Sequence, residues 1–374
     1  MRVLLLVVLS LAAVAADLKP VFPANAAKPI GPYVPGISAG GYLYVSGQGA
    51  RDAAGKLPAT FEEQTRQCLN NVKDIVEAAG LTMQHVVWSQ VFVGDIKNLG
   101  VVDKVYASFF PNSPPARETA AVVKMPGETP VEIAVVAVRD PGQRKVISVQ
   151  KARTASDAIQ VGDRIYISGM LGVDAKNSVP KQPEAQVNAA LKQLTTVLAK
   201  AGMEVRNLGY AHVFVDDGIP LKILVDMLRE ALPSEAAVTI TQTSALPRGA
   251  HVEISGVASK VAQRQGDCVA IGETIYCPAA AGTIEQALQR IKDNMAIAKI
   301  GLDRVVVSNV FLDDINEFQA MNKVYGATFG DWQPTRVTLQ PAAKGDELKL
   351  PPSTDSAPPK ADSPRVRITV VAVQ

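Results

Sequence analysis

Three strings of residues recur in the same order along the 374-residue chain, at intervals of about 110 to 122 residues. Each repeat opens with apolar residues that alternate around a glycine-containing turn, which is typical of two paired strands. The three openings are 36–48, 158–170 and 268–279. Self-similarity at a regular interval indicates one structural unit copied three times, so the fold must be built from three similar units.

Each repeat continues with the same order of elements. A helical pattern ends at a glycine, Gly80, Gly202 or Gly301, and a short strand and a second helix follow. Each repeat closes with a strand, over 131–138, 252–258 or 366–373. This order predicts an α+β fold in which helices cover one face of a mixed sheet. Three copies can bury their remaining sheet faces against one another, which predicts a pseudo-threefold, barrel-like core from a single chain.

The repeats divide the chain into segments. We expect a signal peptide over 1–16, and repeats over 17–141, 145–260 and 261–374. Residues 343–365 hold five prolines with Lys, Asp and Ser, a composition that predicts a solvated loop without a core of its own. We interpret this loop as a tolerated insertion in the third repeat rather than a functional lid.

The first sixteen residues have the pattern of a cleavable secretory signal. Arg2 precedes an apolar run, and small residues end at Ala16. The run is too short to span a bilayer, and so is every later stretch, so we expect a soluble protein exported to the periplasm or outside the cell. The net charge of +2 and the 20% of charged residues do not favour a nucleic-acid or membrane partner.

Two of the three cysteines flank a predicted hairpin. Counting back from a turn at Gly272-Glu273, Cys268 lies opposite Cys277 as a non-hydrogen-bonded pair, with a Cα separation of about 4.5 Å. That separation is within disulfide range, and export favours oxidation, so we predict a cross-strand disulfide rather than two buried thiols. Cys68 lies in a helical pattern and is expected to be core.

Two charged residues of the first repeat stand in otherwise strand-like surroundings: Arg117, in Pro114-Pro-Ala-Arg-Glu-Thr119, and Glu132, in Val131-Glu-Ile133. Charged side chains usually face solvent or form a structural salt bridge, and from these two residues alone that reading is favoured. The three histidines have no metal-ligand spacing, so no metal site is expected. Ser46 has no base within its motif, which argues against a nucleophilic serine.

The first repeat resembles the RidA (YjgF-type) family of imine and enamine deaminases. The resemblance covers the motifs 28–34, Tyr44-Val-Ser-Gly-Gln48, 67–81, Pro115-Ala-Arg117 and Val131-Glu-Ile133. It implies a chorismate-mutase-like fold, in a family whose homotrimers enclose clefts at subunit junctions. It further implies that this chain is a monomer acting as a pseudo-trimer.

The resemblance also implies roles for single residues. Arg117 matches the arginine that binds the substrate carboxylate, and Glu132 matches the acid that orients or activates water. Ser46, Gly47 and Tyr33 match groups that line the cleft, and together with Asp103 and Thr119 they are the expected substrate-binding residues. Asp103 stands where many members carry Asn, which adds a negative charge near an anionic ligand.

The other two repeats lack part of these motifs. The second keeps Ser168, Gly169 and Glu253 but has Val238 at the arginine position and Ala155 at the tyrosine position. The third keeps Pro334-Thr335-Arg336 and Asn322, but Arg367 replaces the glutamate and Pro278-Ala279 replaces Ser-Gly. We therefore predict one working site per chain at most, centred on repeat 1. Which neighbouring repeat completes the cleft beside Arg117 stays open, and an incomplete repeat could supply half a site.

Two functions follow from these expectations. The first is cofactor-free hydrolysis of small 2-imino or enamine acids to 2-oxo acids and ammonia, in which an arginine binds the carboxylate and a glutamate moves protons. The alternative is a non-catalytic protein that binds small carboxylates or acts as a scaffold, with degenerate sites. A ribonuclease activity is least favoured, because the sequence shows neither a basic surface nor a histidine pair.

Overall fold

The computed structural model describes residues 17–148, 154–342 and 366–374. The described chain forms three six-stranded sheets, one per repeat. The expected signal peptide and the proline-rich loop lie outside the described residues. In each sheet one neighbouring pair is parallel and the other pairs are antiparallel, which confirms the predicted mixed sheet.

The first sheet has the strand order β1-β2-β3-β6-β4-β5. Its strands are β1 (Lys19–Val21), β2 (Gly36–Ala39), β3 (Tyr42–Gln48), β4 (Val86–Val93), β5 (Ala116–Ala121) and β6 (Val131–Val138). The second sheet has the order β11-β10-β12-β9-β8-β7. It contains β7 (Arg144–Ile147), β8 (Ala158–Val161), β9 (Arg164–Leu171), β10 (Leu208–Val215), β11 (Ala237–Gln242) and β12 (Val252–Ser259).

The third sheet has the same order as the first, β13-β14-β15-β18-β16-β17. Its strands are β13 (Gln263–Gln265), β14 (Cys268–Ile271), β15 (Thr274–Gly282), β16 (Val305–Leu312), β17 (Thr335–Leu339) and β18 (Val366–Val373). In every repeat the parallel pair joins the strand after the first helix to the strand after the second. This places the strand that carries the arginine motif, β5 or β17, at one edge of its sheet.

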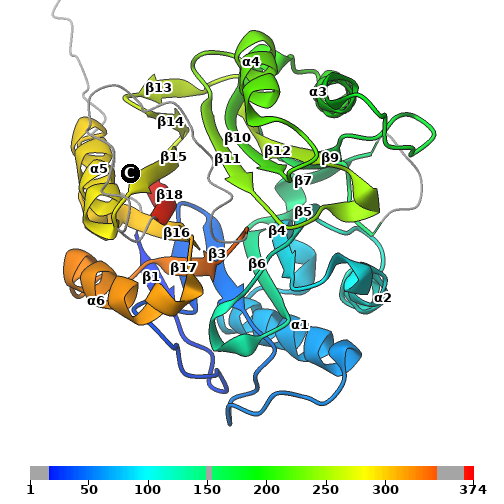
Figure 1. Cartoon of the computed structure of the whole chain (residues 1–374). Coiled ribbons are helices and arrows are strands. Elements are labelled where there is room, and N and C mark those ends of the chain that lie inside the picture. Colours follow the sequence, from blue (N-terminus) through cyan, green and yellow to red (C-terminus); the bar gives the residue numbers. More distant parts are fainter. Residues whose placement is uncertain (1–16, 149–153, 343–365) are drawn as a thin grey trace, which may run out of the picture.

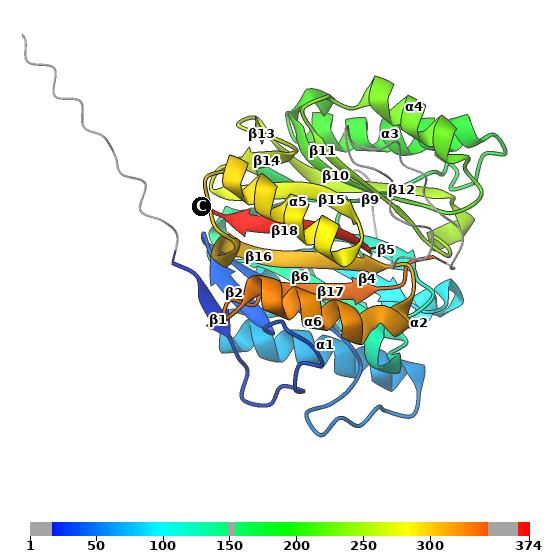
Figure 2. The ribbon, with the colours of Figure 1, turned by 60° about the vertical axis from the view of Figure 1, so that its left-hand side comes forward.

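Two helices cover the outer face of each sheet. They are α1 (Phe61–Ala78) and α2 (Leu99–Phe109), α3 (Pro183–Lys200) and α4 (Leu221–Ala231), and α5 (Ile284–Ile297) and α6 (Phe318–Phe329). Short 3-10 helices are η1 (Met83–His85), η2 (Ile96–Asn98), η3 (Pro126–Glu128), η4 (Pro141–Gln143), η5 (Val205–Asn207), η6 (Pro247–Gly249), η7 (Leu302–Arg304) and η8 (Ile315–Glu317). Figure 1 shows the three helix pairs on the outside and the sheets facing a common centre. Figure 2 shows α5 and α6 across the outer face of the third sheet.

Local sequence explains where these helices begin and which face they bury. α1 starts at a capping box, in which the Thr60 side chain accepts from the Glu63 backbone N–H and the Glu63 side chain accepts from the Thr60 N–H. Its apolar side chains recur at helical spacing, and Leu69, Val72 and Val76 are fully buried against the sheet. Each repeat therefore has a core of its own between sheet and helices.

The inner faces of the three sheets pack against one another around the centre. Phe92, Phe214 and Phe311 occupy the same position in β4, β10 and β16, and all three are fully buried in one apolar cluster. A second shared cluster contains Trp88, Tyr210 and residues of all three sheets. The predicted pseudo-threefold core is confirmed, and all three repeats contribute residues to it.

A polar network lies between these two clusters. Glu118 is fully buried and accepts hydrogen bonds from Gln90 (2.6 Å) and Ser255, and its Oε1 lies 3.2 Å from His212 Nδ1. The other ring nitrogen of His212 lies 3.0 Å from Thr241 Oγ1. Burial raises the pKa of Glu118, but His212 and the hydrogen bonds more than offset this, so the pKa lies below its usual value.

The structure tests two local predictions, the glycines after the first helices and the register of the hairpin between the two cysteines. Gly80 and Gly202 have the positive φ expected after a helix (75° and 72°). In the third repeat this conformation falls on Lys299 (φ 59°), and Gly301, at φ −91°, instead precedes η7. The first helix of repeat 3, α5, whose apolar spacing is the least regular of the three, therefore ends further before its glycine than α1 and α3 do. The predicted hairpin register is confirmed, and a disulfide joins Cys268 to Cys277.

Among the described residues, no helix is both long and apolar enough to cross a membrane.

Replacing Glu118 by alanine should lower the free energy of unfolding by about 3–5 kcal/mol, because His212, Gln90 and Ser255 would lose their partner inside the core. Chemical denaturation of the whole chain measures this. The control is Glu62→Ala, which removes an exposed carboxylate from the salt bridge with Lys104 and should change stability far less, because solvent screens a surface ion pair. Equal effects of the two variants would contradict a structural role for the network.

Candidate functional site at the junction of repeats 3 and 1

Successive repeats meet where the arginine-bearing strand of one repeat reaches the serine of another. The backbone N–H of Arg336 donates to Ser46 Oγ (3.0 Å), and Ser46 Oγ donates to the Val34 carbonyl (2.6 Å). The backbone N–H of Arg117 makes the same bond to Ser168 Oγ (2.8 Å). Repeat 3 therefore contributes its arginine to repeat 1, and repeat 1 contributes its arginine to repeat 2.

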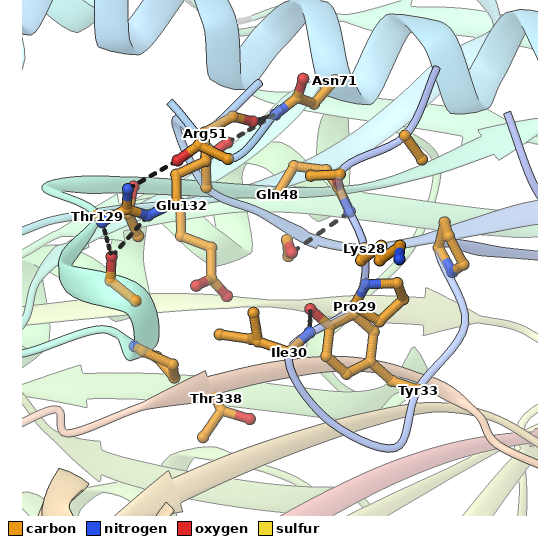
Figure 3. Close-up of a pocket in the computed structure, with 18 of the residues that line it drawn as sticks. Lys28, Pro29, Ile30, Tyr33, Gln48, Arg51, Asn71, Thr129, Glu132 and Thr338 are labelled. Atoms are coloured by element: carbon orange, nitrogen blue, oxygen red, sulfur yellow. Dashed lines mark hydrogen bonds between the residues drawn. The ribbon is translucent and has the colours of Figure 1, made fainter. Parts of the chain in front are cut away.

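A cavity of about 480 Å³ lies at the junction of repeats 3 and 1. Repeat 1 lines it with Tyr33, Gly47 and Glu132, and repeat 3 lines it with Arg336 and Thr338. Figure 3 shows the Glu132 carboxyl group extending into this cavity on the side of Ile30 and Thr338. The cavity thus joins an arginine and a glutamate from two different repeats.

Arg336 is a buried cation, and its Nε and Nη2, both closed to solvent, have no hydrogen-bond partner among the residues that the structure describes. Its residue surface is only 3% exposed. The rings of Tyr33, Tyr325 and Phe318 lie 5.0, 5.0 and 5.5 Å from its guanidinium carbon, which holds the group by cation–π contacts. Burial lowers the pKa of Arg336, but an arginine stays charged at neutral pH. A buried guanidinium with two free nitrogens is suited to binding an anion in two-pronged fashion.

Glu132 lies in the same cavity and is only 6% exposed. Burial raises its pKa to about 8, although a backbone hydrogen bond from Thr338 and the charge of Arg336 act in the opposite direction. Glu132 therefore holds a proton at neutral pH and can give it to a bound ligand. A raised pKa in a cavity beside a cation is a feature of acid–base sites.

Two glycines leave room for the side chains of Glu132 and Arg336. A Cβ on Gly47 would lie 2.0 Å from Glu132 Oε1, and a Cβ on Gly31 would lie 2.4 Å from Arg336 Nη2. Any side chain at either position would displace a functional group. This explains the glycines in Tyr-Val-Ser-Gly-Gln and Lys-Pro-Ile-Gly-Pro-Tyr by close approach rather than by turn geometry.

From sequence we expected Arg117 and Glu132 to act together, and the structure separates them. Arg117 faces repeat 2, where Thr119 also donates its backbone N–H to Glu253 Oε1 (2.9 Å). Tyr33, Ser46, Gly47 and Glu132 do lie together, at the other junction. Arg117 lies on β5, the edge strand that contacts repeat 2, whereas Glu132 lies on β6 and lines the cavity shared with repeat 3. The two side chains therefore belong to different junctions.

The junction of repeats 1 and 2 contains a second arginine and glutamate with different electrostatics. Arg117 Nη2 forms an ion pair with Asp103 Oδ1 at 2.8 Å. Burial raises the pKa of Glu253 to about 8, as it does for Glu132. At the position equivalent to Asp103, the repeat 3 helix carries Asn322, which has no charge. Arg117 is thus neutralised within its own repeat, whereas Arg336 is not.

The junction of repeats 2 and 3 has neither group. Val238 occupies the arginine position, and the backbone N–H of Ala279 donates to Thr239 Oγ1 (3.1 Å). Arg367, at the glutamate position, forms an ion pair with Asp313 (2.7 Å). At this junction the hydrogen bond runs in the opposite sense, from repeat 3 to repeat 2, and the arginine and glutamate of the other two junctions are replaced.

Sequence reasoning missed the part that repeat 3 plays in the first cavity. Arg336, Asn322, Thr338 and Phe318 all come from that repeat. Pro334-Thr335-Arg336 was recognisable as an arginine motif, but the sequence left open which repeat completes each cleft, so it did not assign Arg336 to Glu132. The threefold repeat could have pointed to this arrangement, because in a ring of three copies the edge strand of each copy contacts the next copy.

No group of three or more histidine, cysteine, aspartate or glutamate side chains suited to a metal ion occurs within residues 17–148, 154–342 and 366–374.

The family model described as Endoribonuclease L-PSP matches three times, over 23–139, 149–260 and 272–349. The chain therefore belongs to this family, with three copies of its domain. This confirms the resemblance drawn from the motifs of the first repeat, and the repeated α+β fold.

Individual relatives match about one third of the chain. A RutC family protein of Saccharolobus solfataricus is 41% identical over 122 residues, which are 31% of this chain and 94% of the relative. The 2-iminobutanoate/2-iminopropanoate deaminase of Escherichia coli K12 is 40% identical over 119 residues, 31% of this chain and 93% of its own. The crystal structure of the YjgF gene product of E. coli is 39% identical and covers 33% of this chain and 99% of its own, with a TM-score of 0.32.

The raised pKa values predict how stability depends on pH. Between about 4.5, the ordinary pKa, and about 8, the folded chain keeps protons on Glu132 and Glu253 that the unfolded chain releases. The free energy of unfolding should therefore fall as pH rises through this window, by up to about 1.4 kcal/mol per pH unit for each residue. The Glu132→Gln/Glu253→Gln variant, which mimics the protonated forms, should show a flatter profile in denaturation at several pH values. An unchanged slope would contradict the raised pKa values.

Proposed function

We propose that the chain hydrolyses 2-imino acids to 2-oxo acids and ammonia, without a cofactor, in the cavity between repeats 3 and 1. The observation that carries this proposal is the buried Arg336 with two unpartnered nitrogens, in a cavity that also contains the protonated Glu132. The deaminase activity in the name of the E. coli relative supports the same reaction class.

Arg336 binds and orients the substrate in this proposal. The substrate carboxylate accepts hydrogen bonds from Nε and Nη2, the two guanidinium nitrogens without a partner in the described part of the chain. The three aromatic rings around the guanidinium fix its plane, and therefore the direction of the bound carboxylate. The neutral Asn322 leaves the positive charge of Arg336 available to the substrate.

Glu132 moves the protons. It first gives its proton to the imine nitrogen, which makes the carbon of the C=N bond more electrophilic. The resulting carboxylate then takes a proton from water as the water oxygen bonds to that carbon. Transfer of the hydroxyl proton to nitrogen through Glu132 allows the C–N bond to break, which releases ammonia and leaves the 2-oxo acid and a protonated Glu132.

The pKa of Glu132 suits this double role. A pKa of about 8 leaves the acid protonated at neutral pH, so that proton transfer to the imine begins the reaction. The positive charge of Arg336 favours the ionised form of Glu132. A substrate carboxylate bound to Arg336 cancels that charge, so Glu132 stays protonated when substrate is bound. Isosteric Glu132→Gln would keep the shape of the cavity but could not transfer a proton.

Arg336→Ala should lower kcat/KM for hydrolysis of a 2-imino acid about a hundredfold, which corresponds to losing about 3 kcal/mol from charge-assisted hydrogen bonds. Arg117→Ala should change it less than about threefold. The assay generates the imine in situ with an amino-acid oxidase, removes peroxide with catalase, and follows competition between hydrolysis and trapping by semicarbazide. The reverse order, with Arg117→Ala the inactive variant, would move the site to the other junction.

Glu132→Gln separates catalysis from binding. Turnover should be lost, while binding of 2-oxobutanoate, measured by calorimetry, should persist through Arg336. If the unaltered protein binds 2-oxobutanoate but no imine is hydrolysed faster than without protein, the chain is a carboxylate-binding protein and the proposed reaction is wrong.

A further inference from the structure

A second, much smaller cavity of about 40 Å³ lies among the inner faces of the three sheets, which face a common centre (Figure 1). All three repeats line it, with Trp88 from repeat 1, Tyr210 from repeat 2 and Asn309 from repeat 3. It has Arg336 in common with the cavity at the junction of repeats 3 and 1, and the other residues of the two linings differ. We call it the central cavity.

The central cavity exists because the repeats differ in side-chain size at one position. Trp88, Tyr210 and Val307 are each the first residue of β4, β10 or β16 in the parallel ladder with β5, β11 or β17. They are therefore equivalent, and all three line the cavity. Two repeats fill this layer with an aromatic ring, whereas the valine of repeat 3 leaves space that close packing would otherwise remove.

Trp88 brings a hydrogen-bond donor without a partner to this cavity. The residue is buried, and its Nε1 is closed to solvent and has no partner among the residues that the structure describes. By contrast, Trp332, the other tryptophan of the chain, donates from Nε1 to the Val305 carbonyl (2.8 Å). A buried indole N–H can only donate, so Trp88 requires an acceptor that the described chain does not supply.

Asn309 brings an acceptor without a partner to the same cavity. Its Oδ1 is closed to solvent and accepts no hydrogen bond from the described residues. In repeat 1 the equivalent residue, Gln90, pairs with Glu118 across the parallel ladder and donates to its carboxylate (2.6 Å). In repeat 3, Asn309 pairs with Val337, whose side chain has no polar group. A lone donor and a lone acceptor at one cavity point to a ligand that both accepts and donates.

The volume and the charges of the central cavity identify this ligand. A volume of about 40 Å³ exceeds the roughly 10–15 Å³ that one water molecule requires, and is far below that of pockets for organic ligands. The nearby charges have opposite signs, since Arg336 is part of the wall and Glu118 lies one hydrogen bond behind Gln90. They favour neither an anion nor a cation, which leaves a small neutral molecule.

We infer that the central cavity binds roughly one to three water molecules, which accept a hydrogen bond from Trp88 Nε1 and donate one to Asn309 Oδ1. The bound water joins repeat 1 to repeat 3 at the centre of the ring, where their side chains do not satisfy each other. This inference does not rest on the proposed function.

A high-resolution crystal structure of the whole chain tests the inference directly. We expect electron density inside the cavity, within hydrogen-bond distance of Trp88 Nε1 and of Asn309 Oδ1. Crystals grown in bromide should show no anomalous peak at this place. An absence of density would overturn the inference, and an anomalous peak would overturn it in favour of a halide site.

A double-mutant cycle tests the water link in solution by chemical denaturation. Trp88→Phe and Asn309→Leu each remove one hydrogen-bonding group and keep an apolar side chain in its place. Each single variant should lower the folding equilibrium constant about tenfold or more, because it leaves the opposite group unsatisfied. The double variant should lose less than the product of the two single effects, because neither group is then left without its partner.

The matched control combines Trp88→Phe with Val76→Ala, a fully buried valine of the outer core of repeat 1 that does not line the central cavity. The effects of this pair should multiply, as they do for independent sites. Effects of Trp88→Phe and Asn309→Leu that multiply in the same way would overturn the water link. If a variant does not fold, the crystal structure of the unaltered chain still decides the inference.

Discussion

The structure depends on one hydrogen bond pattern between repeats. In two of the three junctions the backbone N–H of an arginine donates to a serine hydroxyl of the neighbouring repeat. In the third, the bond runs instead from the Ala279 N–H to the Thr239 hydroxyl. At the two serine junctions these contacts set the arginine-bearing edge strand against the serine–glycine segment of β3 or β9 in another repeat. Among the described residues, the two arginine–glutamate sites are therefore each built from two repeats.

A single chain makes each of these junctions once, and the three have become different. In a symmetric trimer any substitution would appear at all three junctions, whereas here each junction has its own residues. One combines a free Arg336 with Glu132, one pairs Arg117 with Asp103, and one has Val238 in place of the arginine. The Glu118–His212 network at the centre also requires different residues from two repeats. Asymmetry in the core and asymmetry at the sites therefore share one origin, the covalent linkage of the repeats.

The sequence was sufficient for the fold because the fold follows from local patterns. Alternation around glycine turns, helical spacing and the threefold recurrence predicted the sheets, helices and shared core, and turn counting predicted the Cys268–Cys277 pair. The site was predicted only in part. Ser46, Gly47, Tyr33 and Glu132 were identified together, but Arg336 was not assigned to them, because spacing within a repeat says nothing of which neighbour it faces. The pKa of Glu132 depends on burial by another repeat and is likewise not visible in the sequence.

The most direct test of the account is a crystal structure of the whole chain with 2-oxobutanoate, the product of hydrolysis of 2-iminobutanoate. The account predicts one bound molecule at the junction of repeats 3 and 1, with its carboxylate within hydrogen-bond distance of Arg336 Nε and Nη2 and its oxo group beside Glu132. The ion-paired Arg117 should have no ligand at the same concentration. A molecule bound at Arg117, with none at Arg336, would contradict the assignment of the site.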